Sequence, residues 1–356
     1  MTGRLPVAVT GTLLAMMYVA VIMSHASWDP TALLAVGIDS GPQLEYAEGV
    51  LQREVSTRAE RGHDGRFFFI LANDPLLLAP QENAAFLDLP TYRAQRVLYP
   101  LLAGGLGLLT AGLTVWGLIF VNLFAVGLGT YATATVARTL GANQWLGLTF
   151  IVNPGVIAEL DIDGGGVLAL ALGMLGLAFV IERSDSWSVV ALTGAVLARE
   201  TMLLFVGGIV VWQWLSRRPL RPALLAVPVL GAFVWRVYAG VRLSVVETSA
   251  ETSEGLLRNF ELVPLRGAIE ASARWTDDPT RLIWILSLVA ILLLFVRRAW
   301  SNRSIVAWSS WPFALLILFL SATVWIEPYD IARAIAPVFV AYPLLLFAKE
   351  SLATTS

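Results

Sequence analysis

Apolar residues in this chain fall into long runs that polar or charged residues interrupt. Many runs approach roughly 17 to 25 residues, the length of helix that crosses the hydrocarbon core of a membrane. Backbone polar groups inside a bilayer must be satisfied within the segment itself, so such runs predict helices, whereas a barrel would show short alternating strands. The pattern therefore predicts an all-α fold, a polytopic transmembrane helical bundle of about ten spans.

The predicted spans share an apolar centre bounded by charged residues, Gly or Pro. They lie near residues 5–24, 113–137, 146–152, 167–181, 188–197, 202–215, 223–239, 282–296, 305–324 and 334–347. A polar loop, 26–96, separates the first two spans, and a second long loop covers 241–279. The short apolar piece at 97–110 is predicted to be a re-entrant or interfacial helix. No detachable domain is evident, so residues 1–356 are expected to form a single transmembrane domain.

Basic residues in short loops predict the orientation, because they favour the cytoplasmic side. If residues 97–110 do not cross, the basic residues of alternate loops all fall on one side with the N-terminus. They are Arg138, Arg183, Arg217, Arg218, Arg221, Arg297, Arg298, Arg303 and Lys349. Both termini are then cytoplasmic. Nearly all acidic residues fall on the opposite face, so the functional site is expected there.

Composition agrees with a membrane protein, since 57% of residues are hydrophobic, 14% are charged and the mean hydropathy is +0.72. No basic patch for nucleic acid is present. The chain has no cysteine, which excludes disulfides and cysteine nucleophiles, and its two histidines argue against a metal site built from histidines. The first apolar run exceeds the length of a signal-peptide core, so it is interpreted as an uncleaved span.

The stretch GHDGRFFFILANDP, residues 62–75, places charged residues beside three consecutive phenylalanines. Gly62 and Gly65 flank Asp64 and let backbone or ligand approach its carboxylate closely. The phenylalanine run suits the membrane interface. Asp64 can then act as a general base on a substrate hydroxyl or hold a metal ion. The alternative is that Asp64 caps the helix that follows.

The stretch VNPGVIAELDIDGGG, residues 152–166, carries three carboxylates at the end of a predicted span. Glu159, Asp161 and Asp163 are costly at a membrane boundary unless they are solvated, paired or bound to a cation. Without a later acidic ligand they do not form a calcium-binding EF-hand loop. They predict either acceptor binding or a solvated turn with a helix cap.

Two further polar turns lie on the same predicted face. In LARETM, Arg199 and Glu200 either pair with charges from other turns, or Arg199 contacts an anionic ligand. In WIEPYDIARAIAP, Arg333 follows Asp330 by three residues, so the two either pair on one helical face or Arg333 binds a phosphate. Tyr329 lies beside them.

The segment TYRAQRVLYP places Arg93 and Arg96 three residues apart, on one face of a predicted helix. Such residues before an interfacial helix are typical of headgroup anchors. The alternative is a second phosphate clamp.

Together, HDGRFFFILANDP, the aromatic-Pro segment RVLYPLLA, the NPG turn and the ARET turn resemble the type C (GT-C) glycosyltransferases. These are multispanning enzymes that use lipid-linked sugar donors. The similarity is to the polytopic mannosyltransferases of glycosylphosphatidylinositol assembly and related bacterial membrane proteins. The chain departs from the family in two ways: Asp64 lacks a paired acidic neighbour, and there is no soluble C-terminal domain.

The resemblance implies an inverting transfer of a sugar from a polyprenyl-phosphate donor to an acceptor hydroxyl at the outer face of a bacterial plasma membrane. It implies that Asp64 is the catalytic base and that Arg333, with Arg199, meets the donor phosphate. The residues assigned to substrate or acceptor binding are Asp161, Asp163, Glu159, Tyr329, His63 and Arg66. No resident cofactor is implied, although a divalent cation is compatible with the chemistry.

The expected partners are the lipid-linked donor, a glycan, lipid or protein acceptor, and membrane lipids, with no nucleic acid. Two alternatives stay open. One is a transporter or flippase for a lipid-linked or anionic substrate, with charges near the middle of the bilayer and interrupted helices. The other is a catalytically inactive GT-C-like scaffold.

Overall fold

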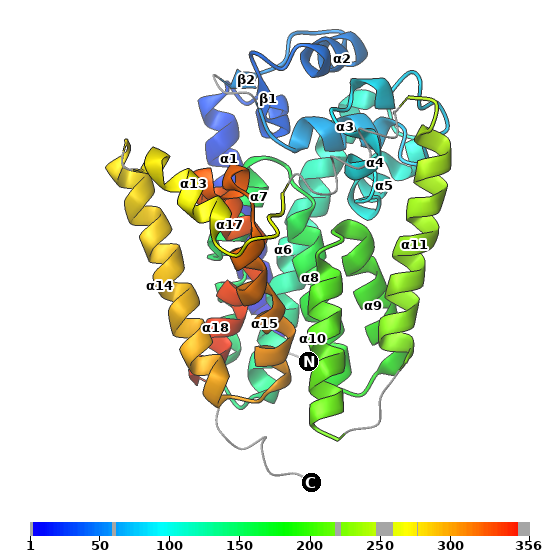
Figure 1. Cartoon of the computed structure of the whole chain (residues 1–356). Helices are drawn as coiled ribbons and strands as arrows, with labels where there is room; N and C mark the ends of the chain where they lie inside the picture. Colours follow the sequence, from blue (N-terminus) through cyan, green and yellow to red (C-terminus); the bar gives the residue numbers. More distant parts are fainter. Residues whose placement is uncertain (1–2, 59–61, 218–221, 247–258, 276, 348–356) are drawn as a thin grey trace.

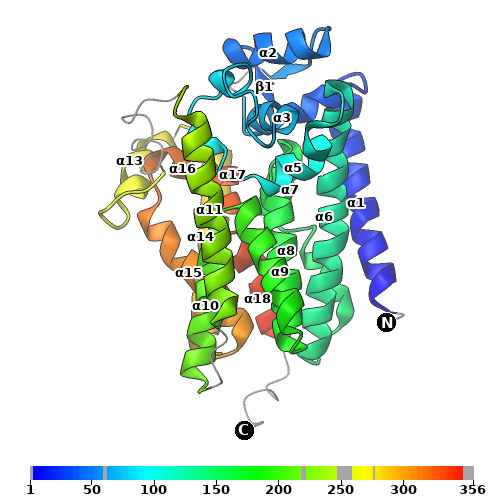
Figure 2. The same ribbon diagram turned by 90° about the vertical axis from the view of Figure 1, so that its right-hand side faces the viewer.

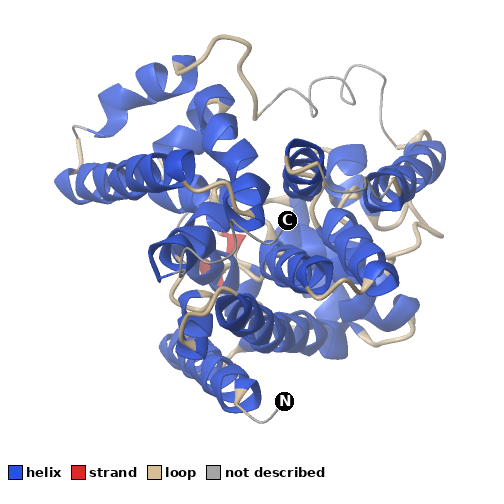
Figure 3. Ribbon diagram, turned by 90° about the horizontal axis from the view of Figure 1, so that it is seen from below, coloured by secondary structure: helices blue, strands red, loops and turns tan. Residues whose placement is uncertain are grey.

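The computed structural model describes residues 3–58, 62–217, 222–246, 259–275 and 277–347. In this part of the chain the backbone is mostly helical, and strand is confined to one short pair (Figure 3). This confirms the predicted all-α class. Of the basic residues used to predict orientation, Arg218, Arg221 and Lys349 lie outside the described residues.

The long helices run between the two ends of the molecule (Figures 1 and 2). They and their shorter apolar neighbours are α1 (Arg4–His25), α6 (Ala111–Thr139), α8 (Gly166–Ile181), α9 (Asp185–Ala198), α10 (Met202–Leu215), α11 (Ala223–Leu243), α14 (Pro279–Ser301), α15 (Ile305–Leu316) and α18 (Ala336–Phe347).

Shorter elements fill the turns. They are η1 (Pro30–Leu34), β1 (Val36–Gly37), α2 (Pro42–Leu51), β2 (Thr57–Arg58), α3 (Gly65–Asn73), η2 (Ala84–Phe86), α4 (Pro90–Arg93), α5 (Leu98–Gly104), η3 (Gly105–Gly107), η4 (Gln144–Thr149), α7 (Pro154–Asp161), α13 (Arg266–Trp275), η5 (Ile317–Phe319), α16 (Ala322–Ile326) and α17 (Pro328–Ala334). The elements α2, α3, α4, α13 and α17 lie toward the upper end in Figure 1.

Four helices, α1, α6, α11 and α14, are long and apolar enough to cross a membrane, and α17 with α18 forms a fifth candidate that bends by 67°. Their outward faces expose large apolar side chains, such as Phe124 on α6 and Phe233 on α11, as lipid contact requires. The structure thus supports a membrane protein with four or five such spans among the described residues, while the finer count of ten is not confirmed.

The predicted span at 146–152 is not one continuous helix. The chain there forms η4, only six residues long, and then restarts as α7 after Asn153. Pro154 lacks a backbone N–H and suits the first turn of a helix, which explains the restart. Asn153 accepts a hydrogen bond from Gly155 N at 2.9 Å and donates one to Ala336 O at 2.8 Å.

That second contact joins the two interruptions, because Ala336 begins α18 directly after its bend with α17. Pro337 removes a donor and crowds the carbonyl four residues earlier, so a continuous helix would be strained there. The segment at 97–110 forms the seven-residue α5 and the short η3. At about 1.5 Å per residue, α5 spans only about 10 Å and does not cross a bilayer.

Candidate active site

The backbone around Asp64 is held in place by the preceding loop. β1 and β2 pair in parallel, Gly62 bridges to Val36, and His63 N donates to Ala35 O at 2.9 Å. Gly62 has a φ of +77°, and a Cβ there would lie 2.4 Å from Gly37 N. Only glycine fits this left-handed position against a neighbouring backbone.

Gly65 allows a second close approach, because a Cβ on it would lie 2.4 Å from Ile162 O. The start of α3 therefore rests directly on the turn between α7 and α8. The two glycines permit the predicted close approach of backbone, but the expectation that they leave the Asp64 carboxylate uncrowded is wrong, because three arginines surround it.

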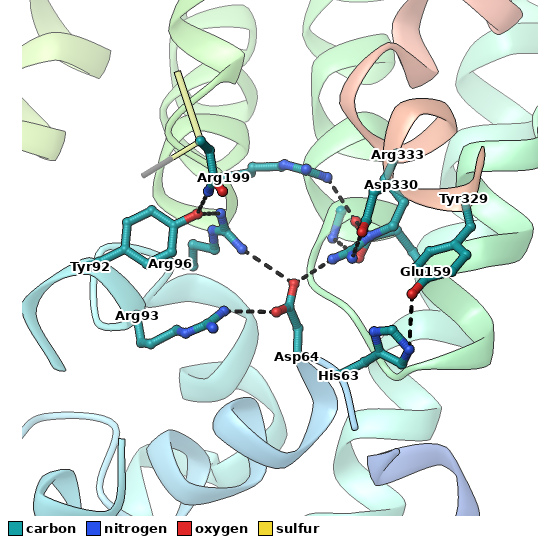
Figure 4. A network of polar contacts seen from close by, with 12 residues as sticks. His63, Asp64, Tyr92, Arg93, Arg96, Glu159, Arg199, Tyr329, Asp330 and Arg333 are labelled. Carbon is teal, nitrogen blue, oxygen red and sulfur yellow. Dashed lines mark hydrogen bonds and ion pairs between the residues drawn. The ribbon is translucent and has the colours of Figure 1, made fainter. Parts of the chain in front are cut away.

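The Asp64 carboxylate does not cap α3. Asp64 occupies the N-cap position, yet its side chain makes no capping hydrogen bond. Its Oδ1 accepts instead from Arg93 Nη1 at 2.7 Å, and its Oδ2 accepts from Arg333 Nη2 (Figure 4). Arg96 Nη1 lies 3.7 Å from the same Oδ2. The alternative of a capping aspartate is therefore wrong, and the carboxylate lies among three guanidinium groups.

This environment keeps Asp64 ionised. Burial alone would raise the pKa of the carboxyl, but the charges of Arg333, Arg93 and Arg96 outweigh burial and hold the pKa well below its usual value. The side chain of Asp64 remains 18% exposed.

Arg333 connects Asp64 to a second buried carboxylate. Its Nε donates to Glu159 Oε1 at 2.8 Å and its Nη1 to Asp330 Oδ1 at 3.0 Å, which confirms the predicted pairing with Asp330. Arg199 Nη1 reaches the same Glu159 oxygen at 2.7 Å, and Gly166 N donates to Oε2 at 3.1 Å. Glu159 thus holds both arginines that the sequence assigns to a donor phosphate.

The partner of Glu200 is Arg96, which donates to both of its oxygens at 3.1 Å. Arg96 also donates to Tyr92 Oη at 2.9 Å. The interpretation that Arg199 and Glu200 pair with charges from other turns is therefore confirmed. Four guanidinium groups and five carboxylates alternate across the network; they are Arg93, Arg96, Arg199, Arg333, Asp64, Asp88, Glu159, Glu200 and Asp330.

His63 lies at the edge of this network. Its Nε2 is 3.2 Å from Tyr329 Oη, and the two rings meet edge to face. Burial lowers the pKa of His63, with Asp330 opposing the shift. A neutral imidazole beside a tyrosine hydroxyl is suited to binding a polar ligand group.

The other residues assigned to the substrate lie apart from Asp64. Asp161 Oδ2 accepts from Arg58 Nη1 at 2.7 Å, and Arg66 donates to Ser40 Oγ. Asp163 faces the interior, where it meets Tyr99 and Asn122. The three carboxylates of 152–166 therefore have three different environments, and their roles in acceptor binding stay predictions.

A small cavity adjoins the network between α8, α10 and α17. Arg199, Thr201 and Arg333 line it on the polar side, and Leu170, Met202, Phe313 and Pro337 line it on the apolar side. Its volume of about 20 Å³ accommodates roughly one water molecule. A sugar phosphate is much larger, so its binding requires these side chains to separate.

The network does not suit a resident metal ion. Within the described ranges, no three His, Asp or Glu side chains gather in a way that could hold one. Each carboxylate near Asp64 already has an arginine partner, and those guanidinium charges would repel a divalent cation.

The sequence pointed to Asp64, Arg199 and Arg333, but it did not predict that Arg93 and Arg96 contact Asp64. Arg93 and Arg96 were interpreted first as headgroup anchors, whereas both side chains turn toward Asp64. Their spacing of three residues was the available signal. Tyr99 stood in the segment RVLYPLLA that the sequence analysis singled out, but nothing there indicated that it meets Asp163, and Asn122 stood out no more than the other polar residues of α6.

Comparison with known proteins adds no relative. No family model matches this chain, and no match was found among curated proteins or solved structures.

Proposed function

We propose that this protein is a membrane glycosyltransferase that moves a sugar from a polyprenyl-phosphate donor to an acceptor hydroxyl on the non-cytoplasmic face. The observation that carries the proposal is the direct contact of Asp64 with Arg333, within a network of four arginines at one end of an apolar helical bundle. A carboxylate for proton transfer and guanidinium groups for a phosphate are what this chemistry needs.

In the proposed reaction the acceptor oxygen attacks the anomeric carbon while the bond from that carbon to the phosphate oxygen breaks. Asp64 takes the acceptor proton. Polyprenyl phosphate leaves, and Arg333 and Arg199 stabilise its negative charge. A single displacement inverts the anomeric centre. His63 and Tyr329 lie where they can orient the acceptor.

The network also supplies a reason for ordered binding. With three arginines around it, Asp64 is a weak base. A donor phosphate that draws Arg333 away from Asp64 returns the carboxyl pKa toward its usual value, and the base becomes stronger once the donor is bound. Glu159 keeps Arg333 and Arg199 paired until then.

The test is transfer from polyprenyl-phosphate sugars by protein reconstituted in vesicles, comparing wild type with Asp64→Asn. We expect the substitution to lower the transfer rate by about 10² to 10⁴. Asp88→Asn is the matched control, because Asp88 is a carboxylate that pairs with the same Arg93 on its far side, Oδ1 to Nε at 2.8 Å. That variant should retain transfer.

Full transfer by Asp64→Asn would show that Asp64 is not the general base. If wild type consumes no lipid-linked sugar from a broad donor panel, the transferase proposal fails and the inactive scaffold becomes the better hypothesis.

One observation favours a second function, a transporter or flippase. Two apolar segments are interrupted, at Asn153 between η4 and α7 and at the bend between α17 and α18, and the interruptions touch through Asn153 and Ala336. Broken helices that meet are a feature of transporter sites. Here the charged residues gather toward one end of the bundle, which fits an enzyme better. Movement of unmodified lipid-linked substrate across vesicles, abolished in Arg333→Lys, would favour the transporter.

A further inference from the structure

A second buried carboxyl, Asp163, lies outside the arginine network. It is 2% exposed and sits in the turn between α7 and α8 with a positive φ of +48°. Asn122 Nδ2 donates to its Oδ1 at 3.0 Å, and Tyr99 Oη lies 3.1 Å from the same oxygen. Among the described residues Asp163 has no basic partner.

Two oxygen atoms in this cluster are left without hydrogen-bond partners in the part of the chain that the structure describes. They are Asp163 Oδ2 and Asn122 Oδ1, both buried. Each belongs to a group whose other polar atom is already bonded to the opposite residue. A buried acceptor oxygen that receives no hydrogen bond is unfavourable in a low-dielectric interior.

We propose that Asp163 is a buried proton-binding site whose acid form donates a hydrogen bond to Asn122 Oδ1. One proton then satisfies both unpartnered oxygens, and Asp163 and Asn122 form a carboxylic acid–amide pair with a hydrogen bond in each direction. The inference does not depend on the proposed transferase activity.

The surrounding groups agree with a neutral acid. Burial raises the pKa of Asp163 to about 7, with the hydrogen bonds from Asn122 and Tyr99 opposing the shift. The titratable residues of α5 and α7 are Tyr99, Glu159 and Asp161, and none of them is cationic. Two arginines reach this part of the chain, and both pair with other carboxylates, Arg58 with Asp161 and Arg199 with Glu159. The helix α8 has no titratable residue.

The basic residues of the remaining packed helices are directed elsewhere. On α3 the one titratable side chain is Arg66, which donates to Ser40. On α6 the titratable residues are Tyr131 and Arg138, at least nine residues or about 14 Å further along the helix than Asn122. No described cation therefore compensates an ionised Asp163.

The proton site is linked structurally to the arginine network. Gly164 N donates to Glu159 O at 2.8 Å and Gly166 N donates to Glu159 Oε2. The same turn that carries Asp163 thus holds Glu159, which in turn holds Arg333 and Arg199. Loss of the proton would place an unpaired charge in this turn and disturb its packing.

The direction of the pH effect follows from the raised pKa. The folded protein retains the proton at pH values where the unfolded carboxyl, with a pKa near 3.8, has lost it. The stabilisation from the proton is therefore complete below about pH 4 and is lost as pH rises toward about 7.

The experiment combines infrared spectroscopy with thermal unfolding of the full chain in detergent. Wild type at about pH 5 should show the carbonyl stretch of a protonated carboxyl, absent from Asp163→Asn and lost on raising the pH beyond about 7. Asn122→Leu should keep the band but shift it to higher frequency, because a hydrogen bond to the acid is lost.

Asp163→Asn is neutral and retains both hydrogen bonds with Asn122. We expect it to raise Tm by about 2 °C or more at about pH 8 and to leave Tm nearly unchanged at about pH 5. The matched control is Asp161→Asn, in the same turn but paired with Arg58 at the surface, which should show no such gain at either pH.

Two outcomes overturn the proposal. The first is that the wild-type and Asp163→Asn spectra at about pH 5 do not differ by the carbonyl stretch of a protonated carboxyl. Asp163 would then be ionised. The second is that sodium chloride raises the Tm of the wild type at about pH 8 whereas choline chloride does not, and that sodium chloride does not raise the Tm of Asp163→Asn. That result would assign the two oxygens to a metal cation instead of a proton.

Discussion

Asp64 and Asp163 are two buried carboxyls with opposite surroundings. Asp64 meets three guanidinium groups, whereas Asp163 meets only an amide and a phenol. The two lie on chain segments that touch, since Gly65 rests on the carbonyl of Ile162. The comparison shows that burial does not decide the charge of a carboxyl, because the number of cationic neighbours reverses its effect on the pKa.

This contrast matters for the proposed chemistry. A carboxylate among arginines stays charged and ready to accept a proton once a phosphate occupies the arginines. A carboxyl without a cation instead keeps a proton and stabilises the turn below the site. Substitutions that alter the surroundings of either carboxyl test this contrast, and their expected effects differ in size.

The largest effect is expected from Arg333→Ala. Arg333 pairs with Asp64, Glu159 and Asp330. Its loss removes the arginine partner of Asp330 and one of the charge partners of the buried Glu159 and of Asp64, which keep Arg199 and Arg93, respectively. We expect the free energy of unfolding to fall by about 3 to 5 kcal/mol. Measurement of unfolding in detergent at neutral pH tests this. Arg333→Lys, which keeps the charge but not the fork of donors, should lose less, and equal loss in both variants would contradict the argument.

The pH dependence of stability should separate the two carboxyls. Asp64 has a lowered pKa, so its contribution is complete above about pH 4 and is lost as pH falls through the folded value. Asp163 has a raised pKa, and its contribution is lost as pH rises from about 4 to about 7. Tm measured from below about pH 4 to about pH 8 should fall less on the acid side in Asp64→Asn and less on the neutral side in Asp163→Asn. Identical pH profiles of Tm for the two variants would contradict the opposite pKa shifts of Asp64 and Asp163.

The smallest effect is expected from Gly65→Ala, which alters the contact between the two segments. The new methyl group would meet Ile162 O at 2.4 Å, a backbone atom that has little freedom to move. We expect a loss of about 1 to 3 kcal/mol in the free energy of unfolding. Gly49→Ala is the matched control, since a Cβ there meets nothing within 4 Å. A stable Gly65→Ala variant would mean that the contact is looser than described.

Much of the fold could be predicted because hydrophobicity over a run is a local property. The positions of α1, α6, α11 and α14 follow from their apolar runs. The sequence correctly ended the predicted span at 146–152 before Pro154, where α7 begins, but its apolar run did not reveal that the chain there forms the short 3₁₀ helix η4. The site was predictable only in part, as the sequence indicated charged turns on one face but not which charges meet.

The sequence by itself determined the apolar helices and the polar turns between them, and it singled out Asp64 and Arg333. Only the tertiary structure decided the pairings, which join Asp64 to Arg93 across 29 positions and to Arg333 across 269. It also decided that Asp163 meets Asn122 rather than an arginine. The physical reason is that helix formation depends on neighbouring residues, whereas the charge state of a buried carboxyl depends on whichever distant helices pack against it.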